Sequence, residues 1–343
     1  MHFYYSGFNG SACLFLEDSG VFLDSFTEIP FPGLTDFQIG WGYFLLWHSK
    51  ELFISKNYPD DCGRKKIEQI EIPECPESCK QAAIGRDSII ILSKRNNVWK
   101  HKIYEGNWSK VPNFVPQNDN SESEYPINIL QAGGTIVLTN LGRVFNVPVL
   151  VDMPKRTKFI DIACGFDHTI LLSENGDIYS MGMGTRGQLG HQDLEDCDNP
   201  KLIEALAGLK VTRISAGGWH SAVITDQGDL YTWGWNTSGE LGVTTKDTKV
   251  IAVPTLINFR DENEKLIETP IKSVQCGNNF TICVMEDDTI WGCGSNKYGQ
   301  LGQSSRTLKE SPNFLKLPIP AAIVNNKLKE LRCGEWGTLL ITN

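Results

Sequence analysis

Histidine is the first residue type in this 343-residue chain whose chemistry has to be assigned. His168 and His220 each lie three residues after a glycine, in the similar contexts GFDHT and GGWHS. A histidine that recurs at one position of a repeat favours an architectural role over a catalytic one. The chain has no G-x-S-x-G, P-loop or H-E-x-x-H motif. We therefore predict no intrinsic enzymatic activity, no catalytic residue and no cofactor.

Cysteine is the next candidate, because thiolates bind metals and form disulfides. Cys164, Cys276 and Cys333 each directly precede a recurring glycine, a position typical of small packing residues. Among the other cysteines, Cys75-x3-Cys79 is a single pair with Cys62 nearby, whereas a zinc site needs four ligands. The sequence predicts no metal site. No signal peptide or apolar span is visible, so we expect reduced thiols in the nucleus and/or cytoplasm, away from membranes.

Aromatic and charged residues follow the recurring glycines and could bind a partner. Tryptophan, tyrosine and arginine are the usual anchors of protein interfaces, and acidic and aromatic groups together suit a basic partner. The predicted partner-binding residues are Trp41, Arg86, Phe166, Asp167, Trp219, Trp235, Glu335 and Trp336. Trp219 and Trp336 are expected to be exposed and Trp233 buried. For Trp235, burial and exposure are equally compatible with its position.

A repeated unit positions these residues. The segment GDLYTWGWNTSGELG at 228–242 is preceded by GDIYSMGMGTRGQLG at 176–190 and followed by DTIWGCGSNKYGQLG at 288–302. Ahead of each lies a short apolar stretch opened by a glycine, and seven such anchor glycines are 32 to 60 residues apart: Gly40, Gly85, Gly133, Gly165, Gly217, Gly277 and Gly334. Short β-branched stretches ending in Asn-Gly or Gln-Gly predict hairpins. About seven similar sheets predict an all-β, seven-bladed β-propeller.

The two ends of the chain are predicted to share one blade. The last repeat stops after ITN, without its outer hairpin, and Ser6-Gly7-Phe8-Asn9 aligns with Trp233-Gly234-Trp235-Asn236. Residues 3–16 are therefore expected to complete the last blade, making 1–343 a single domain closed by N- and C-terminal strands. Trimming either end should be poorly tolerated.

Composition narrows the partners. The net charge is −9, and the basic runs Arg64-Lys65-Lys66 and Lys155-Arg156-Thr157-Lys158 are short enough to be exposed loops. We therefore expect no direct nucleic-acid binding. The acidic stretch at 113–126 is predicted to be a flexible loop, and 243–270 a long connection that is either decoration or contact surface.

These motifs resemble the regulator of chromosome condensation repeat, strongly over 159–343 and weakly over 1–158. The resemblance rests on Cys164-Gly165, His168-Thr169, Tyr231-Thr232-Trp233-Gly234 and the G-[QE]-L-G tetrapeptides. It implies a seven-bladed propeller that, as in a small member of the family, is a monomeric, non-enzymatic scaffold. Resemblance to that member implies that the partner is a JmjC-type 2-oxoglutarate oxygenase that acts on chromatin. The protein would then associate with chromatin through this partner. Such enzymes modify lysine or arginine, and Arg143 is a speculative substrate position; a solvent-facing strand arginine is the simpler interpretation.

Two alternatives follow from the same resemblance. The founding member is a guanine nucleotide exchange factor for the small GTPase Ran, with a basic N-terminal tail and a protruding loop that this sequence does not match. The plant ultraviolet-B receptor shares the fold and uses tryptophans clustered beside arginine, whereas GGWHS and GEWGT contain no arginine. A nucleotide-release assay and an ultraviolet-induced change in oligomeric state would distinguish them.

Overall fold

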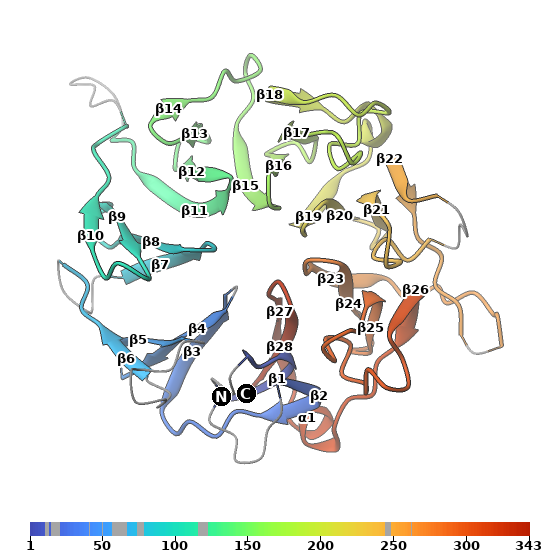
Figure 1. Ribbon diagram of the computed structural model, residues 1–343. Helices are drawn as coiled ribbons and strands as arrows, with labels where there is room; N and C mark the ends of the chain where they lie inside the picture. The colour runs from blue at the N-terminus through green and yellow to red at the C-terminus, as the bar shows by residue number, and fades with distance from the viewer. Residues whose placement is uncertain are drawn as a thin grey trace.

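The computed structural model describes residues 1–10, 14, 21–40, 42–49, 51–56, 67–73, 79–115, 123–243, 248–261 and 263–343. The chain is a closed ring of seven four-stranded antiparallel sheets, here called blades 1 to 7 (Figure 1). In each blade, one strand at the edge of the sheet lies nearest the centre of the ring, and the other three lie progressively further out. The strands of each blade are given below from the innermost to the outermost. The all-β, seven-bladed propeller predicted from the repeats is confirmed.

The first three blades come from the N-terminal half. Blade 1 comprises β3 (Leu34–Ile39), β4 (Tyr43–His48), β5 (Glu51–Lys56) and β6 (Ile67–Ile70). Blade 2 comprises β7 (Cys79–Ile84), β8 (Ser88–Ser93), β9 (Val98–Lys102) and β10 (Trp108–Lys110). Blade 3 comprises β11 (Pro126–Ala132), β12 (Gly134–Thr139), β13 (Val144–Asn146) and β14 (Val149–Leu150).

The next three blades contain the clear repeats. Blade 4 comprises β15 (Phe159–Cys164), β16 (His168–Ser173), β17 (Ile178–Gly182) and β18 (Cys197–Leu202). Blade 5 comprises β19 (Val211–Ala216), β20 (His220–Thr225), β21 (Leu230–Trp235) and β22 (Val250–Leu256). Blade 6 comprises β23 (Ile271–Cys276), β24 (Phe280–Met285), β25 (Ile290–Ser295) and β26 (Glu310–Lys316).

Blade 7 joins both ends of the chain. It comprises β27 (Leu328–Cys333), β28 (Gly337–Thr342), β1 (His2–Phe8) and β2 (Phe22–Glu28), and β1 pairs with β28 from His2↔Thr342 to Gly7↔Gly337. Closure by N-terminal strands is therefore confirmed. The second of these strands lies beyond the expected 3–16, because β2 begins 14 residues after β1 ends, close to the 15-residue step between the third and fourth strands of blades 4 to 6.

Two short helical segments have defined bounds in the described chain. They are a 3₁₀ turn, η3 (Glu204–Leu206), and α1 (Ala321–Asn325). Neither is long and apolar enough to cross a membrane. Of the predicted 113–126 loop, residues 116–122 lie outside the described residues, 113–115 and 123–125 lie outside strands, and Pro126 opens β11.

The hairpin between the second and third strands shows why the repeat contains a glycine there. In blade 4, Gly176 has φ +89° and its N–H donates to the Ser173 carbonyl, while the Ser173 hydroxyl accepts from the Asp177 N–H. Blade 5 repeats the arrangement with Gly228, at φ +82°, and Thr225. Glycine has no Cβ that would make this left-handed conformation costly, so the turn type follows from the sequence.

The apolar core of the described chain is divided among the seven interfaces between blades. Each cluster of buried residues takes side chains from two neighbouring blades, such as Ile170 and Leu172 of blade 4 with Val223 and Trp233 of blade 5. Corresponding clusters occupy the other six junctions. Because burial is shared between blades, a single blade cannot bury its own faces, and the ring holds its turns at fixed positions.

Candidate interaction face at the mouth of the central channel

All seven predicted anchor glycines directly follow an innermost strand. The turns that they open lie around one mouth of the central channel, and we call this side of the ring the anchor face. A cavity of ≈ 390 Å³ opens there, with lining residues from every blade. Backbone hydrogen bonds connect adjacent turns: Phe166 N–H donates to Gly218 O, Gly218 N–H to Asn278 O, and Asn278 N–H to Glu335 O, each at 3.1 Å. The turn residues of blades 4 to 7 are thus tied in a fixed order.

Blade 3 interrupts the rim. Its β11 and β12 are joined by Gly133 alone, whereas three residues join the corresponding strands of the other blades. A second pocket, of ≈ 410 Å³, lies over this short turn and is lined by Arg86 and Lys100 of blade 2 and Phe166 and Asp167 of blade 4. Because the turn of blade 3 is a single glycine, which has no side chain, a residue of blade 2 can contact one of blade 4.

Five of the predicted site residues are brought together in one row with an arginine that the sequence analysis missed. The guanidinium of Arg86 lies 4.9 Å from the Phe166 ring centroid, and the Phe166 and Trp219 rings meet edge to face at 5.1 Å. The guanidinium of Arg186 lies 4.1 Å from the Trp219 ring and 5.5 Å from that of Trp235. We call these residues, with Asp167 beside Phe166, the aromatic–arginine row.

Repeat geometry explains how the row is assembled. The N–H of Trp235 donates to the carbonyl of Trp219 at 2.8 Å, which holds the two residues next to each other, and Arg186 lies near both rings. Arg186 precedes the first glycine of its G-Q-L-G motif, and Tyr298 holds the same place two blades later. Each contacts the tryptophan of the following blade. An alignment of the repeats would therefore have singled out Arg186 by its position. Its contact with the tryptophan of the next blade, however, becomes visible only in the closed ring.

A second aromatic cluster lies at blade 7. Tyr298 meets Trp336 edge to face at 5.5 Å, and Phe8 lies 5.1 Å from Tyr298. The N–H of Phe8 donates to the Trp336 carbonyl at 2.9 Å, as Trp235 donates to Trp219 in blade 5. This cluster is separated from the aromatic–arginine row by blade 6, whose turn presents Asn278 and Asn279.

The expected exposure of the tryptophans needs correction. Trp219 and Trp336 are half-buried, because Phe166, Arg186 and Tyr298 from adjoining blades cover part of each ring. Trp235 is also half-buried. Trp233 is fully buried, as predicted, and its indole N–H donates to the Gln188 carbonyl at 2.9 Å.

The light-sensing alternative had been disfavoured because no arginine adjoins GGWHS in the sequence. In the structure, Arg186 of the preceding blade lies over Trp219, so the absence of a neighbouring arginine in the sequence does not argue against light sensing. The decisive observation remains an ultraviolet-induced change in oligomeric state.

Three further predicted residues complete the account. The half-buried Glu335 lines the channel, where burial raises the pKa of its carboxyl to about 8 and the charge of Arg86 acts in the opposite direction. Asp167 is half-buried beside the short turn of blade 3, and its backbone carbonyl accepts a hydrogen bond from the Met183 N–H. Trp41 lies outside the described residues.

Both repeated histidines form hydrogen bonds between blades, which fits the architectural role that their repetition favours. His168 Nε2 lies 3.0 Å from the Ser221 hydroxyl of blade 5, and His220 Nε2 lies 2.9 Å from the Thr281 hydroxyl of blade 6. Burial lowers the pKa of His168 to about 4 and that of His220 to about 3. Both are therefore neutral at physiological pH. They face the next blade because the second strand of each blade packs against the inner strands of the following blade.

The cysteines behave as packing residues. Cys164, Cys276 and Cys333 line the channel as free thiols, and burial raises the pKa of Cys164 and of Cys276 to about 12. Among the described residues, no group of three histidine, cysteine or acidic side chains could hold a metal ion. Cys62 and Cys75 lie outside the described residues, as do Arg64, Lys65 and Lys66.

Arg143 is neither a free substrate-like side chain nor a plain solvent-facing one. It is half-buried and forms a bidentate ion pair with Glu124, with Nε donating to Oε1 at 2.8 Å and Nη2 donating to Oε2. The same carboxylate accepts from the Thr139 hydroxyl at 2.6 Å. The pair ties the β12–β13 hairpin to the segment before β11. By contrast, Lys155, Arg156 and Lys158 are exposed in a loop, as predicted.

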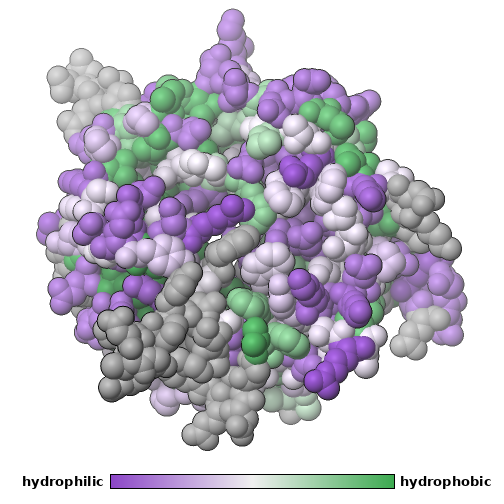
Figure 2. All heavy atoms as spheres, viewed as in Figure 1, coloured by the Kyte–Doolittle hydropathy of each residue, from purple (hydrophilic) through white to green (hydrophobic). Residues whose placement is uncertain are grey.

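The face of the molecule shown in Figure 2 has no single large apolar patch among the described residues. In the view of Figure 2, hydrophilic residues occupy most of the ring, and hydrophobic ones form small separate groups. Fold and site together define a class: a closed seven-bladed β-propeller that presents fixed aromatic and charged turns around a channel mouth.

Comparison with known proteins places the chain within that class. Residues 175–224 and 227–284 match the model of the "Regulator of chromosome condensation (RCC1) repeat", and a second model of this repeat matches 159–188, 211–240 and 271–300. RCC1 domain-containing protein 1 of Homo sapiens is 29% identical over 259 residues, covering 66% of this chain and 67% of that protein. The matched part of the chain, within residues 159–300, therefore carries RCC1 repeats on a seven-bladed propeller.

Solved structures agree on the fold. Human WBSCR16 superimposes with a TM-score of 0.79 at 16% identity, covering 100% of both chains. Prp20p from Saccharomyces cerevisiae, described with its binding properties to Gsp1p and histones, superimposes with a TM-score of 0.76 at 18% identity. That match covers 99% of this chain and 90% of Prp20p. At such identities the likeness establishes the propeller and says nothing of partners.

Proposed function

We propose that this protein is a non-enzymatic interaction scaffold in the nucleus that binds and regulates a chromatin-acting JmjC-type 2-oxoglutarate oxygenase through its anchor face. The observation that carries the proposal is the aromatic–arginine row, in which Arg86, Phe166, Trp219, Arg186 and Trp235 form consecutive contacts across blades. Rigidly held tryptophan and arginine side chains are typical of the energetic centres of protein interfaces. In this row Trp219, Arg186 and Trp235 are half-buried and Arg86 is exposed.

Charge and geometry support a protein partner. The chain has a net charge of −9, which disfavours nucleic acid and favours a partner with basic groups. The identity of the oxygenase follows from the family resemblance alone. In this proposal, chromatin association comes through the partner, and the propeller contributes a rigid surface without chemistry of its own.

Affinity capture from nuclear extract tests the proposal. Tagged wild-type protein is compared with the double variant Trp219→Ala/Trp336→Ala and with Trp108→Ala, a half-buried tryptophan on the outermost strand of blade 2. Circular dichroism must first show that all three are folded. We expect mass spectrometry to find a JmjC oxygenase with the wild type and Trp108→Ala but not with the double variant. Equal capture by all three would place the binding surface elsewhere, and absence of any oxygenase would refute the partner.

A guanine nucleotide exchange factor for a Ran-type GTPase is the second candidate. It comes from the family resemblance, and the fold shared with Prp20p, a protein described with its binding properties to Gsp1p, is compatible with it. The test is nucleotide release from the purified GTPase. A large acceleration by this protein would replace the scaffold proposal, whereas a rate equal to the intrinsic one would remove this candidate.

A further inference from the structure

Two buried oxygen atoms at the channel mouth lack hydrogen-bond partners among the described residues. They are Oδ1 of Asn278 and Oε2 of Glu335, and Asn278 is only 6% exposed. Both side chains line the channel cavity, from turns that the Asn278 N–H to Glu335 O bond holds together. A buried acceptor without a donor is costly, so native proteins rarely keep one unless water or a ligand supplies the donor.

The backbone around these atoms is built to leave room for them. A Cβ added at Gly218 would lie 2.3 Å from Asn278 Oδ1, so any larger residue there would displace the amide. Phe166 forms part of the same cavity wall. The cavity, at ≈ 390 Å³, has room for the end of a long side chain. A metal ion does not fit this position, because no group of three or more histidine, cysteine or acidic side chains able to hold one occurs among the described residues, and calcium takes six to eight oxygen ligands.

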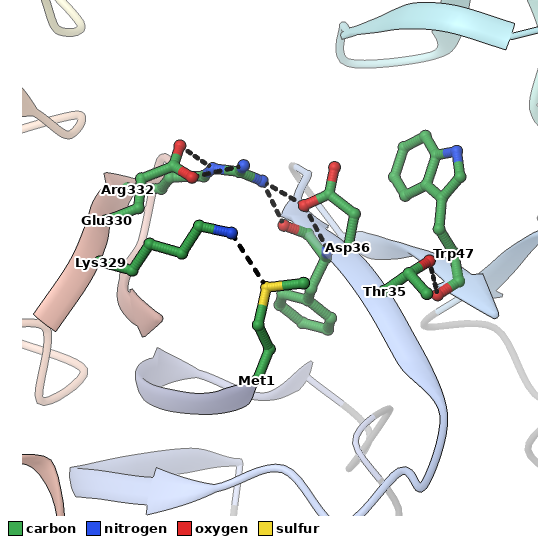
Figure 3. A network of polar contacts seen from close by, with 8 residues as sticks. Met1, Thr35, Asp36, Trp47, Lys329, Glu330 and Arg332 are labelled. Carbon is green, nitrogen blue, oxygen red and sulfur yellow. Dashed lines mark hydrogen bonds and ion pairs between the residues drawn. The ribbon is translucent and has the colours of Figure 1, made fainter. Parts of the chain in front are cut away.

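The cations already near the channel do not fill this position. Arg332 is engaged by Asp36, at 2.6 Å from Nη1, and by Glu330, at 2.6 Å from Nε (Figure 3). Arg86 lies over the Phe166 ring, and its charge acts on Glu335, but Oε2 of Glu335 still lacks a hydrogen-bond partner. The remaining titratable groups that face Glu335 or line its cavity are Tyr43, Cys164, Cys276 and Cys333.

We propose that the channel mouth is a socket for one cationic side chain, the ammonium of a lysine or the guanidinium of an arginine, inserted by the partner protein. Glu335 and Asn278 accept its hydrogen bonds, and Phe166 forms an aromatic wall. The proposal rests on the proposed function, because it assumes that the anchor face binds a protein. It adds the chemistry that this protein must present: an exposed basic side chain at the centre of its contact surface.

The socket makes binding pH-dependent. Burial raises the pKa of Glu335 to about 8, so the empty socket holds mostly the neutral acid at pH 7. An inserted cation favours the carboxylate and therefore releases a proton on binding. Affinity should rise between pH 6.5 and 8.5, since lysine itself stays protonated up to about pH 10. Replacement of Glu335 by glutamine should abolish the rise.

The experiment uses the full chain and three capped pentapeptides, Gly-Gly-X-Gly-Gly, in which X is lysine, arginine or the uncharged norleucine. Binding is measured by isothermal titration calorimetry and by amide chemical shifts. We expect the lysine and arginine peptides to bind at least about tenfold more tightly than the norleucine peptide at pH 8.5, as a charged hydrogen-bonded pair would give. Glu335→Gln should remove this preference, and Asn278→Asp, which adds a second carboxylate, should strengthen it.

Glu174→Gln is the matched control, since Glu174 is an exposed acid on the hairpin at the opposite end of β16. It should leave peptide binding unchanged. Equal binding of the norleucine peptide, no binding of any peptide, or an equal loss with Glu174→Gln would each overturn the socket.

Partner capture separates failure of the socket from failure of the proposed function. If Glu335→Gln captures the oxygenase as wild type does while Trp219→Ala/Trp336→Ala does not, the scaffold stands and the socket is wrong. If the peptides bind through Glu335 but both variants capture the oxygenase fully, the socket stands and the assigned binding face of the scaffold is wrong.

Discussion

Blades 4 to 6 and blades 1 to 3 form the same sheets but are held to their neighbours in different ways. In blades 4 to 6 the connection from the third to the fourth strand is long and carries the G-[QE]-L-G motif. In blades 2 and 3 it shortens to 103–107 and 147–148. We call blades 4 to 6 the regular arc and blades 1 to 3 the irregular arc. The regular arc alone matches the family models.

The long connections of the regular arc supply one repeated contact. The carbonyls of Gln188, Glu240 and Gln300 accept hydrogen bonds from hydroxyls of the next blade: Ser221 at 3.0 Å, Thr281 at 2.6 Å and Thr338 at 2.7 Å. His168 and His220 reinforce two of these hydroxyls. A repeated sequence thus encodes a repeated bond, which is why this arc is easily recognised.

In the irregular arc, different side-chain hydrogen bonds at each blade junction take the place of that repeated bond. The Gln81 amide donates to Asn128 Oδ1 at 2.8 Å and to Ile129 O at 3.0 Å, while the Gln131 amide donates to Ala83 O at 3.0 Å. Tyr43 donates its hydroxyl to Gly85 O at 2.8 Å. The Gln81 and Gln131 contacts come from inner strands, because the outer connections of blades 2 and 3 are too short to reach the neighbouring blade. The comparison teaches that blade geometry can persist while the contacts that hold it diverge.

The largest effect is expected where the two arcs are joined, at blade 7. Deleting β1 (His2–Phe8) removes a central strand, leaving β2 unpaired and the ring open. We expect the loss of any cooperative thermal transition, measured by circular dichroism. The control Val149→Ser/Leu150→Ser alters the exposed outermost strand of blade 3 and should cost less than about 1 kcal/mol. A cooperative transition in the deletion variant would show that blade closure is dispensable.

The next effect compares contacts between blades in the two arcs. His220→Ala removes a fully buried side chain and its bond to Thr281, so we expect a loss of about 3 kcal/mol in the free energy of unfolding. Gln81→Ala, in the half-buried contact of the irregular arc, should cost about 1 kcal/mol. Urea denaturation measures both. Equal losses would mean that the repeated contact is no stronger than the individual ones.

The pH dependence of these histidines has a defined sign. Because the pKa of native His220 is about 3 and its unfolded value is about 6.5, the unfolded chain binds more protons between those values. Stability should therefore fall as the pH drops below about 6.5. His220→Ala should lose part of this acid sensitivity, and an unchanged pH profile would contradict the assigned burial of a neutral imidazole.

Glu240 sharpens the comparison within the regular arc, because the equivalent residues are Gln188 and Gln300. The Glu240 carboxyl is buried, and burial raises its pKa to about 7 from 4.5. The native state then binds more protons between pH 4.5 and 7, so stability falls as the pH rises through that window. Glu240→Gln should stabilise the protein by about 2 kcal/mol at pH 8.5 and have little effect at pH 4. Thermal melts at both values provide the measurement; equal shifts would argue against the raised pKa.

The smallest effect is expected at the ion pair that joins blade 7 to blade 1. Arg332 of β27 reaches Asp36 of β3 and also donates to Phe37 O, while Lys329 reaches Met1 (Figure 3). The Arg332 and Asp36 side chains are 29% and 35% exposed, so Arg332→Met should cost about 1 kcal/mol or less. The loss should shrink in 0.5 M salt. A large, salt-independent loss would mean that the carbonyl bond dominates.

Much of the fold could be predicted because the sequence of each blade repeats the same motif. All seven anchor glycines, including the weak ones at Gly40, Gly85 and Gly133, follow innermost strands. The alignment of Gly7 with Gly234 is confirmed by its pairing with Gly337 and by Asn9, whose Oδ1 accepts from Leu14 N–H as Asn236 accepts from Leu241. The second N-terminal strand was placed too early because the long connection of blade 7 has no recognisable motif.

The candidate site could be predicted only in its position. Phe166, Trp219 and Glu335 line one face because each follows an anchor glycine. Their neighbours could not be predicted: Arg186 is 33 residues from Trp219, and the tryptophans expected to be exposed are half covered by the adjoining blades. Exposure depends on what the next blade presents, and sequence spacing does not contain that information.

By itself, the sequence determined the blade count, the hairpin turns and the face that carries the candidate residues. These properties are local or periodic, since they depend on glycine conformations and on alternating apolar residues within a single blade. Tertiary structure alone decided that His220 bridges to Thr281, that Arg86 reaches Phe166 over the short turn of blade 3, and that Asn278 and Glu335 converge on one cavity. Those contacts join different blades, and their geometry exists only once burial between blades has closed the ring.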